Sequence, residues 1–385
     1  MPSLASRFDH LPPYPLADVP VIRRELRAKG VDVIDLGAGD ADLAPPPAAV
    51  RAMTEAMADP GMSRYPFQLG LPGFREAIAA WMRKRFDVEL DPYQEVLPLI
   101  GSKEGIAHLA FCYVEAGTAT IVPDPGYQAY LGGTVLAGGE PYLVPLRPEH
   151  DFLVPLHTIP DDVVRRARIL YLNYPNNPTA ASAPDAYLEQ AVAFCREHDI
   201  ILAYDNAYSE IAFDGYRPAS ILQIDGARDV AIEFHSLSKT YNMTGWRIGW
   251  AAGSRALVSA LSRAKTFVDT GVFLGVQAAG KACLDSYDDW VPGNVAQFQE
   301  RRDALARAMA DQGFDVKVPN ATMYLWVPVP GGASEPFARR ALVEQGVVIM
   351  PGAALGAGGE GFFRVALTQP ANRLVEAAER LGRLL

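Results

Sequence analysis

"ARILYLNYPNNPTAASAPDAYLEQAVAFCREHDIILAYD", residues 167–205, contains the strand, helix and strand on which the predicted fold depends. The runs "ARILYLN" and "IILAYD" are short and β-rich, as expected of strands. Between them, Ser182 stands three residues before Asp185, which predicts a capping box and a helix that begins at Ser182. A strand, a helix and a second strand in this order are typical of parallel strands that a helix connects.

The same alternation extends on both sides of this stretch. The helical pattern "SKEGIAHLAFCYV" (102–114) follows the β-rich run "EVLPLIG" (95–101). Further β-rich runs are "ATIVPDPGY" (119–127), "PYLVPL" (141–146), "VAIEFHS" (230–236) and "WRIGWAAG" (246–253). Strands that alternate with helices predict an α/β fold with a mostly parallel sheet and helices on both of its faces.

The pattern changes after about residue 285. A polar helix is predicted around 294–313, followed by β-rich runs at 323–329, 346–352 and 362–368 and by a closing helix from Ala371. This order is typical of a smaller α+β domain, which we expect the N-terminal arm, with a short helix at 19–30, to complete. The predicted division is an arm and part of the small domain at 1–44, a large domain at 45–284 and a small domain at 285–385.

Composition excludes several classes of protein. The 385 residues are 49% apolar and 21% charged, as in globular proteins with a sizeable core. The formal net charge of −10 disfavours binding to nucleic acid or to an anionic membrane. Three distant cysteines form neither a disulfide framework nor a metal-binding spacing, so we expect no metal site. Without a signal peptide or a membrane-length apolar run, the expectation is a soluble cytoplasmic protein.

Polar residues occur where the predicted strands end. Asn177 follows the strand at 169–173, Asp205 closes the strand at 200–204, and Lys239 follows the strand at 230–235. Gly101, Ser102 and Lys103 end a further strand and open a helix. Because ligands of open α/β sheets bind outside the carboxyl ends of the strands, these residues predict one shared binding site.

The residue types in this predicted site suit an aldehyde cofactor that carries a phosphate. The segment "IGSKEG" offers backbone N–H groups at a helix N-terminus, and Ser236, Ser238 and Arg247 add donors that suit the same anion. Asp205 either caps the next turn or holds the pyridinium of pyridoxal phosphate. Burial and the nearby charge of Arg247 favour a neutral amine on Lys239, which can form an imine with an aldehyde.

Five motifs resemble a known family. The stretches "YPFQLGLPGFREAIAAW" (65–81), "NYPNNPT" (173–179), "YDNAYSEI" (204–211), "SLSKTYNMTGWRIGW" (236–250) and "FFRVAL" (362–367) occur in family order. The chain resembles the class I/II aminotransferases that use pyridoxal phosphate, over nearly its whole length. The resemblance implies the PLP-transferase fold type I, with the large domain binding the cofactor. Within the family, the chain is most similar to the LL-diaminopimelate aminotransferase branch.

The resemblance also implies a role for each matching residue. Lys239 would form the Schiff base, Asp205 would hold the pyridine nitrogen, and Asn177 and Tyr208 would bind the phenolic oxygen of the ring. Tyr127 would stack on the ring, while Ser102, Lys103, Ser236, Ser238 and Arg247 would surround the phosphate beside Gly101. Tyr65 would reach the phosphate from the other subunit of a homodimer. Arg364 would bind the substrate α-carboxylate, with Asn177 and Gly39 also lining that pocket.

The implied reaction transfers an amino group from an L-amino acid to a 2-oxo acid in two half-reactions, with LL-diaminopimelate and 2-oxoglutarate as the first candidate pair. Glutamate, aspartate, alanine and aromatic donors stay open, as does a C–S β-lyase or decarboxylase reaction on the same cofactor. The chain has no obvious second arginine for a side-chain carboxylate, which disfavours a strict aspartate aminotransferase. Two departures from the family pattern are Ala180, where glycine is usual, and Ala41, where proline is usual. A cofactor-sensing regulatory module is disfavoured by the acidic charge.

Overall fold

The computed structural model describes residues 2–12, 19–67 and 69–385. Its largest sheet has seven strands in the order β2-β8-β7-β6-β5-β3-β4. These strands are β2 (Val96–Leu99), β3 (Ala119–Asp124), β4 (Glu140–Pro145), β5 (Ala167–Leu172), β6 (Ile201–Asp205), β7 (Ala231–Ser236) and β8 (Gly249–Gly253). Only β8 runs antiparallel to its neighbours in this sheet, so the predicted mostly parallel α/β architecture is confirmed.

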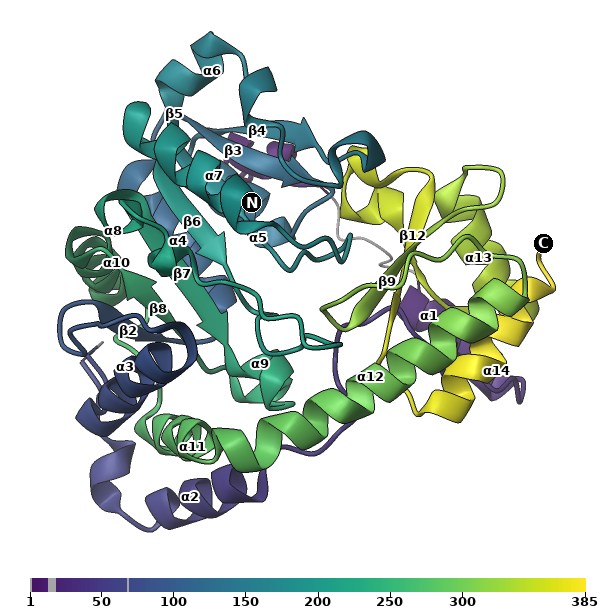
Figure 1. Cartoon of the computed structure of the whole chain (residues 1–385), viewed down its shortest axis with the longest axis horizontal. Coiled ribbons are helices and arrows are strands. Elements are labelled where there is room, and N and C mark those ends of the chain that lie inside the picture. Colours follow the sequence, from purple (N-terminus) through teal and green to yellow (C-terminus); the bar gives the residue numbers. More distant parts are fainter. Residues whose placement is uncertain (1, 13–18, 68) are drawn as a thin grey trace.

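Helices cover both faces of this sheet (Figure 1). Along β5, Ile169 and Tyr171 point into a core shared with α4 (Ser102–Tyr113), α5 (Gln128–Leu136) and α10 (Arg255–Val268). Leu170 and Leu172 point into the opposite core, which contains α3 (Pro72–Phe86), α7 (Asp185–Glu197) and α11 (Leu274–Asp285). The other α-helices around the large sheet are α2 (Pro47–Met57), α6 (Asp161–Arg166), α8 (Ala227–Val230) and α9 (Leu237–Thr240). The alternation of apolar side chains on two faces explains why the strands read as continuous apolar runs.

A second, smaller body lies beside the large sheet (Figure 1). Its strands β9 (Tyr324–Pro328), β11 (Met350–Pro351) and β12 (Phe362–Ala366) form an antiparallel sheet in the order β11-β12-β9. Strand β1 (Ile34–Asp35) pairs with β10 (Val347–Val348), so the segment at residues 34–35 contacts the C-terminal part of the chain. The helices of this body are α1 (Val19–Ala28), α12 (Tyr287–Asp311), α13 (Ser334–Gln345) and α14 (Ala371–Gly382).

Helix α12 connects the two bodies. Its residue Val291 packs in the core under the large sheet, whereas Leu305 packs in the core of the smaller body. The predicted division at residues 44 and 284 stays a prediction. Of the described helices, none combines the length and the apolar character that crossing a membrane would require.

Local details differ from the sequence prediction. Helix α7 begins at Asp185 and not at Ser182, because Pro184 has an extended conformation and Ser182 Oγ donates to Asn320 Oδ1 at 2.9 Å. The capping-box prediction is therefore wrong. Strand β8 begins at Gly249, later than predicted, because Thr244–Trp246 form a 3-10 turn and Arg247 has a left-handed φ of 55°. The helix predicted around 294–313 begins earlier, at Tyr287, and the run 346–352 is divided between β10 and β11.

Candidate active site

The structure brings the polar strand ends together. Asp205 is the last residue of β6, and Lys239 lies in α9, which follows β7 directly. Asn177 follows β5, and Tyr127 follows β3. Since β7, β6, β5 and β3 are consecutive neighbours in the sheet, these four residues lie along one edge, as the sequence predicts.

Lys239 faces the segment that follows β1. Its Nζ donates a hydrogen bond to the carbonyl oxygen of Gly39, although the two residues are 200 positions apart. Ser236 holds the start of helix α9, because its Oγ accepts a hydrogen bond from the N–H of Ser238 at 3.2 Å. The N-terminal segment thus contacts the amine of the lysine that follows β7.

Asp205 is a buried carboxylate with one open oxygen. Its side chain is 6% exposed, and Oδ2 accepts a hydrogen bond from the Tyr130 hydroxyl at 2.8 Å. Among the described residues, Oδ1 has no partner with hydrogen-bond geometry. Burial raises the pKa of Asp205 to about 6, although the Tyr130 hydrogen bond, the backbone of Ala207 and the electrostatic effects of His235 and Lys239 oppose the shift. A buried cationic N–H group would satisfy both the open oxygen and the charge.

A pH-dependent loss of stability follows for the cofactor-free protein. Because the folded-state pKa of Asp205 is about 6 against an ordinary value of 3.8, folding stabilises the protonated carboxyl. This contribution is fully present below pH 3.8 and is lost as the pH rises toward 6 and beyond. Relative to Asp205→Asn, the free energy of unfolding of the wild type should fall by about 1–2 kcal/mol between pH 5 and 7.5. Urea unfolding of both proteins at both pH values measures the difference, and parallel values would contradict the prediction.

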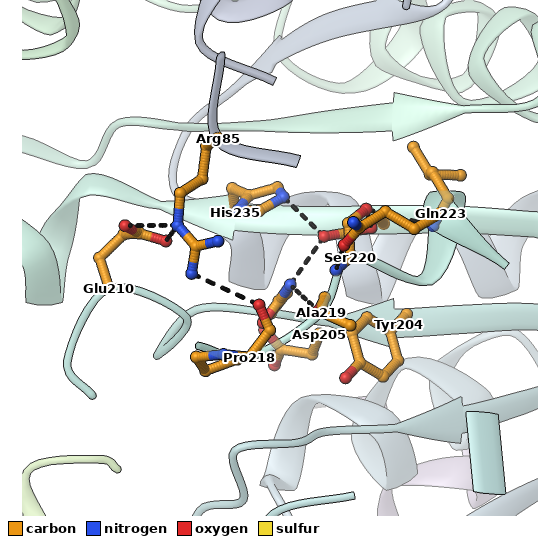
Figure 2. Close-up of polar contacts among 12 residues, drawn as sticks. Arg85, Tyr204, Asp205, Glu210, Pro218, Ala219, Ser220, Gln223 and His235 are labelled. Carbon is orange, nitrogen blue, oxygen red and sulfur yellow. Dashed lines mark hydrogen bonds and ion pairs between the residues drawn. The ribbon is translucent and has the colours of Figure 1, made fainter. Parts of the chain in front are cut away.

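A polar network supports the strand ends next to Asp205 (Figure 2). Glu233, which is fully buried in β7, accepts hydrogen bonds from Asn206 Nδ2 at 2.8 Å and from Ser220 Oγ. The Nε2 atom of His235 lies 2.8 Å from the same carboxylate. Nearby, Arg85 Nε lies 3.1 Å from both carboxylate oxygens of Glu210. These contacts tie the loop that follows β6 to β7, which restrains the position of Asp205.

Arg364 carries a buried positive charge on β12. Its side chain is 5% exposed; Nη1 donates to Asn177 Oδ1 and Nη2 donates to the Gly37 carbonyl, each at 2.7 Å. Neither oxygen carries a full negative charge, and Nε has no partner among the described residues. Since a buried charge needs compensation, this guanidinium is suited to an anionic ligand.

Ala180, which departs from the family pattern, has a left-handed φ of 57°, a conformation that favours glycine.

Two tyrosine hydroxyls meet beside Lys239. The hydroxyl oxygens of Tyr208 and Tyr324 lie 3.1 Å apart, and both side chains are buried. Burial raises the pKa of Tyr208 well above its usual value. A Cβ atom at Gly39 would lie 2.0 Å from the hydroxyl oxygen of Tyr324. Gly39 therefore has no room for a side chain, and the lack of a side chain lets its backbone lie close to the Tyr324 hydroxyl.

The end of β2 forms a positively charged corner. Gly101 has a left-handed φ of 70°, and a Cβ atom there would lie 2.5 Å from Nη2 of Arg247. Helix α4 begins at the next residue, Ser102. Lys103 and Arg247 both reach the surface. Partial desolvation of the Lys103 ammonium and the nearby charge of Arg247 lower the pKa of Lys103. The Lys103 ammonium lies 5.6 Å from the centre of the Tyr127 ring. Two cations at the N-terminus of a helix suit an anion such as a phosphate.

The described chain does not bring Tyr65 into this group. Its side chain is 72% exposed, and its ring centre lies 6.0 Å from that of Phe67.

Two residues of the site, Tyr130 and Tyr324, were not predicted from the sequence. Tyr130 lies three residues after Tyr127, a helical spacing that could have indicated it. No comparable signal indicates Tyr324, because its place depends on the pairing register of β9 with β12.

Comparisons with known proteins identify the family of this chain. The family model described as aminotransferase class I and II matches residues 31–381. The chain is 50% identical over 378 residues to an LL-diaminopimelate aminotransferase of Desulforudis audaxviator, covering 98% of this chain and 96% of that protein. It is 47% identical over 382 residues to one of Moorella thermoacetica, covering 99% and 98% of the two chains.

A solved structure shows the same fold. Substrate-bound BacF from Bacillus subtilis superposes with a TM-score of 0.94 at 33% identity, covering 100% of this chain and 98% of that one. Family model, relatives and fold all extend over nearly the whole chain. The protein therefore belongs to the class I and II aminotransferases, enzymes that depend on pyridoxal phosphate and act on small amino-acid and 2-oxo-acid substrates.

Proposed function

We propose that this aminotransferase moves an amino group from LL-diaminopimelate to 2-oxoglutarate, with Lys239 as the catalytic lysine. The observation that carries the choice of donor is the 50% identity, over 98% of the chain, to a relative named for LL-diaminopimelate. The geometry supports the reaction type, because Lys239 and the unpartnered oxygen of Asp205 lie at the ends of neighbouring strands, and buried Arg364 contacts Asn177 at the end of the next strand.

The residues present fit pyridoxal phosphate. The unpartnered Oδ1 of Asp205 would accept the N–H of the ring, and Asn177 and Tyr208 would bind the phenolic oxygen. Tyr127 would cover the ring face. The phosphate would take the donors of the positively charged corner and of α9, namely Gly101, Ser102, Lys103, Ser236, Ser238 and Arg247. Because Gly101 has no side chain, the Arg247 guanidinium can lie beside the N-terminus of α4.

The bound cofactor supplies an aldehyde that takes up the amino group and a ring that accepts the electron pair left on Cα. The chain's own residues perform the remaining work. Lys239 Nζ would remove the proton from Cα of the amino donor and, in the half-reaction that consumes the 2-oxo acid, would deliver a proton to Cα of the new amino acid. Arg364 would hold the substrate α-carboxylate through its guanidinium, with Asn177 and Gly39 lining the same pocket, and would thereby orient the Cα–H bond toward Lys239.

Replacing Arg364 by alanine should lower kcat/KM for both the amino acid and the 2-oxo acid. A charge-assisted hydrogen bond contributes about 1.5–3 kcal/mol, so a loss of roughly 10- to 150-fold is expected. Steady-state kinetics with each substrate varied in turn measures the effect. The variant Arg364→Lys keeps the charge but not the two-pronged geometry, so it should fall between the wild type and the alanine variant. Unchanged kcat/KM in the alanine variant would assign Arg364 a structural role only.

A panel of amino donors tests the choice of substrate. LL-diaminopimelate, glutamate, aspartate, alanine and an aromatic amino acid are each mixed with the cofactor-loaded enzyme, and the loss of its visible absorption band is followed. We expect the highest rate constant with LL-diaminopimelate, and 2-oxoglutarate should restore the band. A faster reaction with another donor would overturn the proposed substrate. Pyruvate and ammonia released from cystathionine without a 2-oxo acid would instead indicate a β-lyase.

We also propose a cytoplasmic homodimer in which Tyr65 completes the phosphate site of the partner subunit. Tyr65 lies with Phe67 and Leu69 in one exposed segment, and these side chains are 72%, 65% and 51% exposed. Large apolar side chains that gather on a surface indicate an interface. Sedimentation equilibrium of the active enzyme should give twice the chain mass. A fully active monomer would contradict the shared site.

A further inference from the structure

We propose that Tyr324 is a positioning residue of the aminotransferase reaction, which acts on the cofactor side through Tyr208 and on the substrate side through Arg364. The inference rests on the proposed roles of those two residues. Tyr324 lies on β9 and is 2% exposed. Its hydroxyl oxygen is 3.1 Å from that of Tyr208, and its ring centre is 4.2 Å from the guanidinium carbon of Arg364.

The register of the small sheet explains how one side chain reaches both partners. In the pairing of β9 with β12, Tyr324 is opposite Ala366, and Trp326 is opposite Arg364. Because side chains two positions apart point to the same face, Tyr324 and Arg364 are diagonal neighbours on one face of the sheet. This face contacts the large body, where Tyr208 follows the end of β6. Tyr324 therefore spans the boundary between the two sheets.

The direction of the hydrogen bond between the Tyr324 and Tyr208 hydroxyls decides whether Tyr208 can donate a hydrogen bond to the cofactor. Tyr208 can donate its hydrogen to the cofactor's phenolic oxygen only if it does not donate it to Tyr324. We therefore assign Tyr324 as the donor and Tyr208 as the acceptor of the 3.1 Å contact. A hydroxyl that accepts one hydrogen bond becomes a better donor in the next, so Tyr324 should strengthen the bond from Tyr208 to the cofactor.

The ring of Tyr324 has a separate role toward Arg364. The guanidinium stacks over the ring while its two Nη atoms bind Asn177 and Gly37. A cation over an aromatic face is attracted to it, and a planar guanidinium is held in one orientation. The ring therefore fixes the plane in which Arg364 presents its N–H groups to a carboxylate.

Two substitutions separate these roles. Tyr324→Phe removes the hydroxyl and keeps the ring, so the pH midpoint of the visible band of the substrate-free, cofactor-loaded enzyme should rise by about 0.3–1 unit, because a weaker donor stabilises the phenolate less. Its KM for 2-oxoglutarate should stay within about twofold of the wild type. Tyr324→Leu removes the ring as well, so this KM should rise by about 2- to 30-fold, the equivalent of a cation–π interaction of about 0.5–2 kcal/mol.

Tyr187→Phe is the matched control, since Tyr187 is a buried tyrosine of α7 whose hydroxyl donates to the Val154 carbonyl, away from the site. It should change neither the midpoint nor the KM. Thermal melting of all variants shows whether they are folded, and Tyr324→Phe decides the hydroxyl role even if the leucine variant unfolds. An unchanged midpoint in Tyr324→Phe, or an unchanged KM in a folded Tyr324→Leu, would overturn the proposal. Failure of the proposed function would appear differently, as a wild type without the visible band or without amino transfer to 2-oxoglutarate.

Discussion

Lys239→Ala should remove the visible absorption band of the cofactor-loaded enzyme and abolish measurable turnover together. The amine of Lys239 is the group proposed both to bind the cofactor aldehyde and to move the Cα proton. Loss of the positioned acid–base group alone costs about 10²–10⁴-fold in rate, and loss of the covalent link to the cofactor adds to this. Absorption spectra of the purified enzyme and single-turnover reactions with LL-diaminopimelate measure the two effects separately.

Two variants show whether the effect belongs to this amine. Lys239→Arg keeps a positive charge, but a guanidinium does not deprotonate in proteins, so it should be as inactive as the alanine variant. Lys103→Ala removes an exposed lysine of the positively charged corner. It should weaken cofactor binding but retain the visible band and turnover once the cofactor is saturating. Full activity in Lys239→Ala would contradict the assignment of the catalytic lysine.

Much of the fold could be predicted because its signals are local. Each strand of the large sheet is a short β-rich run, and helices separate β2, β3, β4, β5, β6 and β7 along the chain. The carboxyl ends of parallel strands share one edge, so Asn177, Asp205 and Lys239 could be grouped before any contact was known. The predicted helix and strand boundaries are less accurate where two local signals compete. Ser182 favours a helix start at its own position, but the extended Pro184 places the start of α7 at Asp185.

The parts that could not be predicted depend on contacts between distant segments. Strand β8 runs antiparallel to β7, and the segment that joins them contains Arg247 in a left-handed conformation. Arginine does not favour this conformation, so the sequence of the segment gives no sign of the reversal. The contact of Lys239 with Gly39 joins residues 200 positions apart. Tyr324 reaches Tyr208 and Arg364 only through the register of β9 with β12, and register is decided by packing across the whole sheet.

Asp205→Ala should lower kcat/KM for amino transfer by about 10²–10³-fold, the cost of losing one fixed electrostatic partner in a buried site. The carboxylate is the one group proposed to hold a positive charge on the ring nitrogen, and its open Oδ1 has no other partner among the described residues. Glu233, Asn206 and His235, which form a network next to Asp205, are buried as well. Steady-state kinetics at saturating cofactor measures the loss.

Asp205→Asn distinguishes the charge of this side chain from its shape. Its amide oxygen can still accept the hydrogen bond that the Tyr130 hydroxyl donates to Oδ2 at 2.8 Å in the wild type, but it carries no charge. The asparagine variant should therefore lose about as much activity as the alanine variant. Because a buried carboxylate with a pKa of about 6 is costly to ionise, the cofactor-free asparagine variant should also resist urea better than the wild type at pH 7.5. An inactive but more stable variant would show that the Asp205 charge serves catalysis at a cost in stability, whereas wild-type activity would contradict the proposed role of the charge.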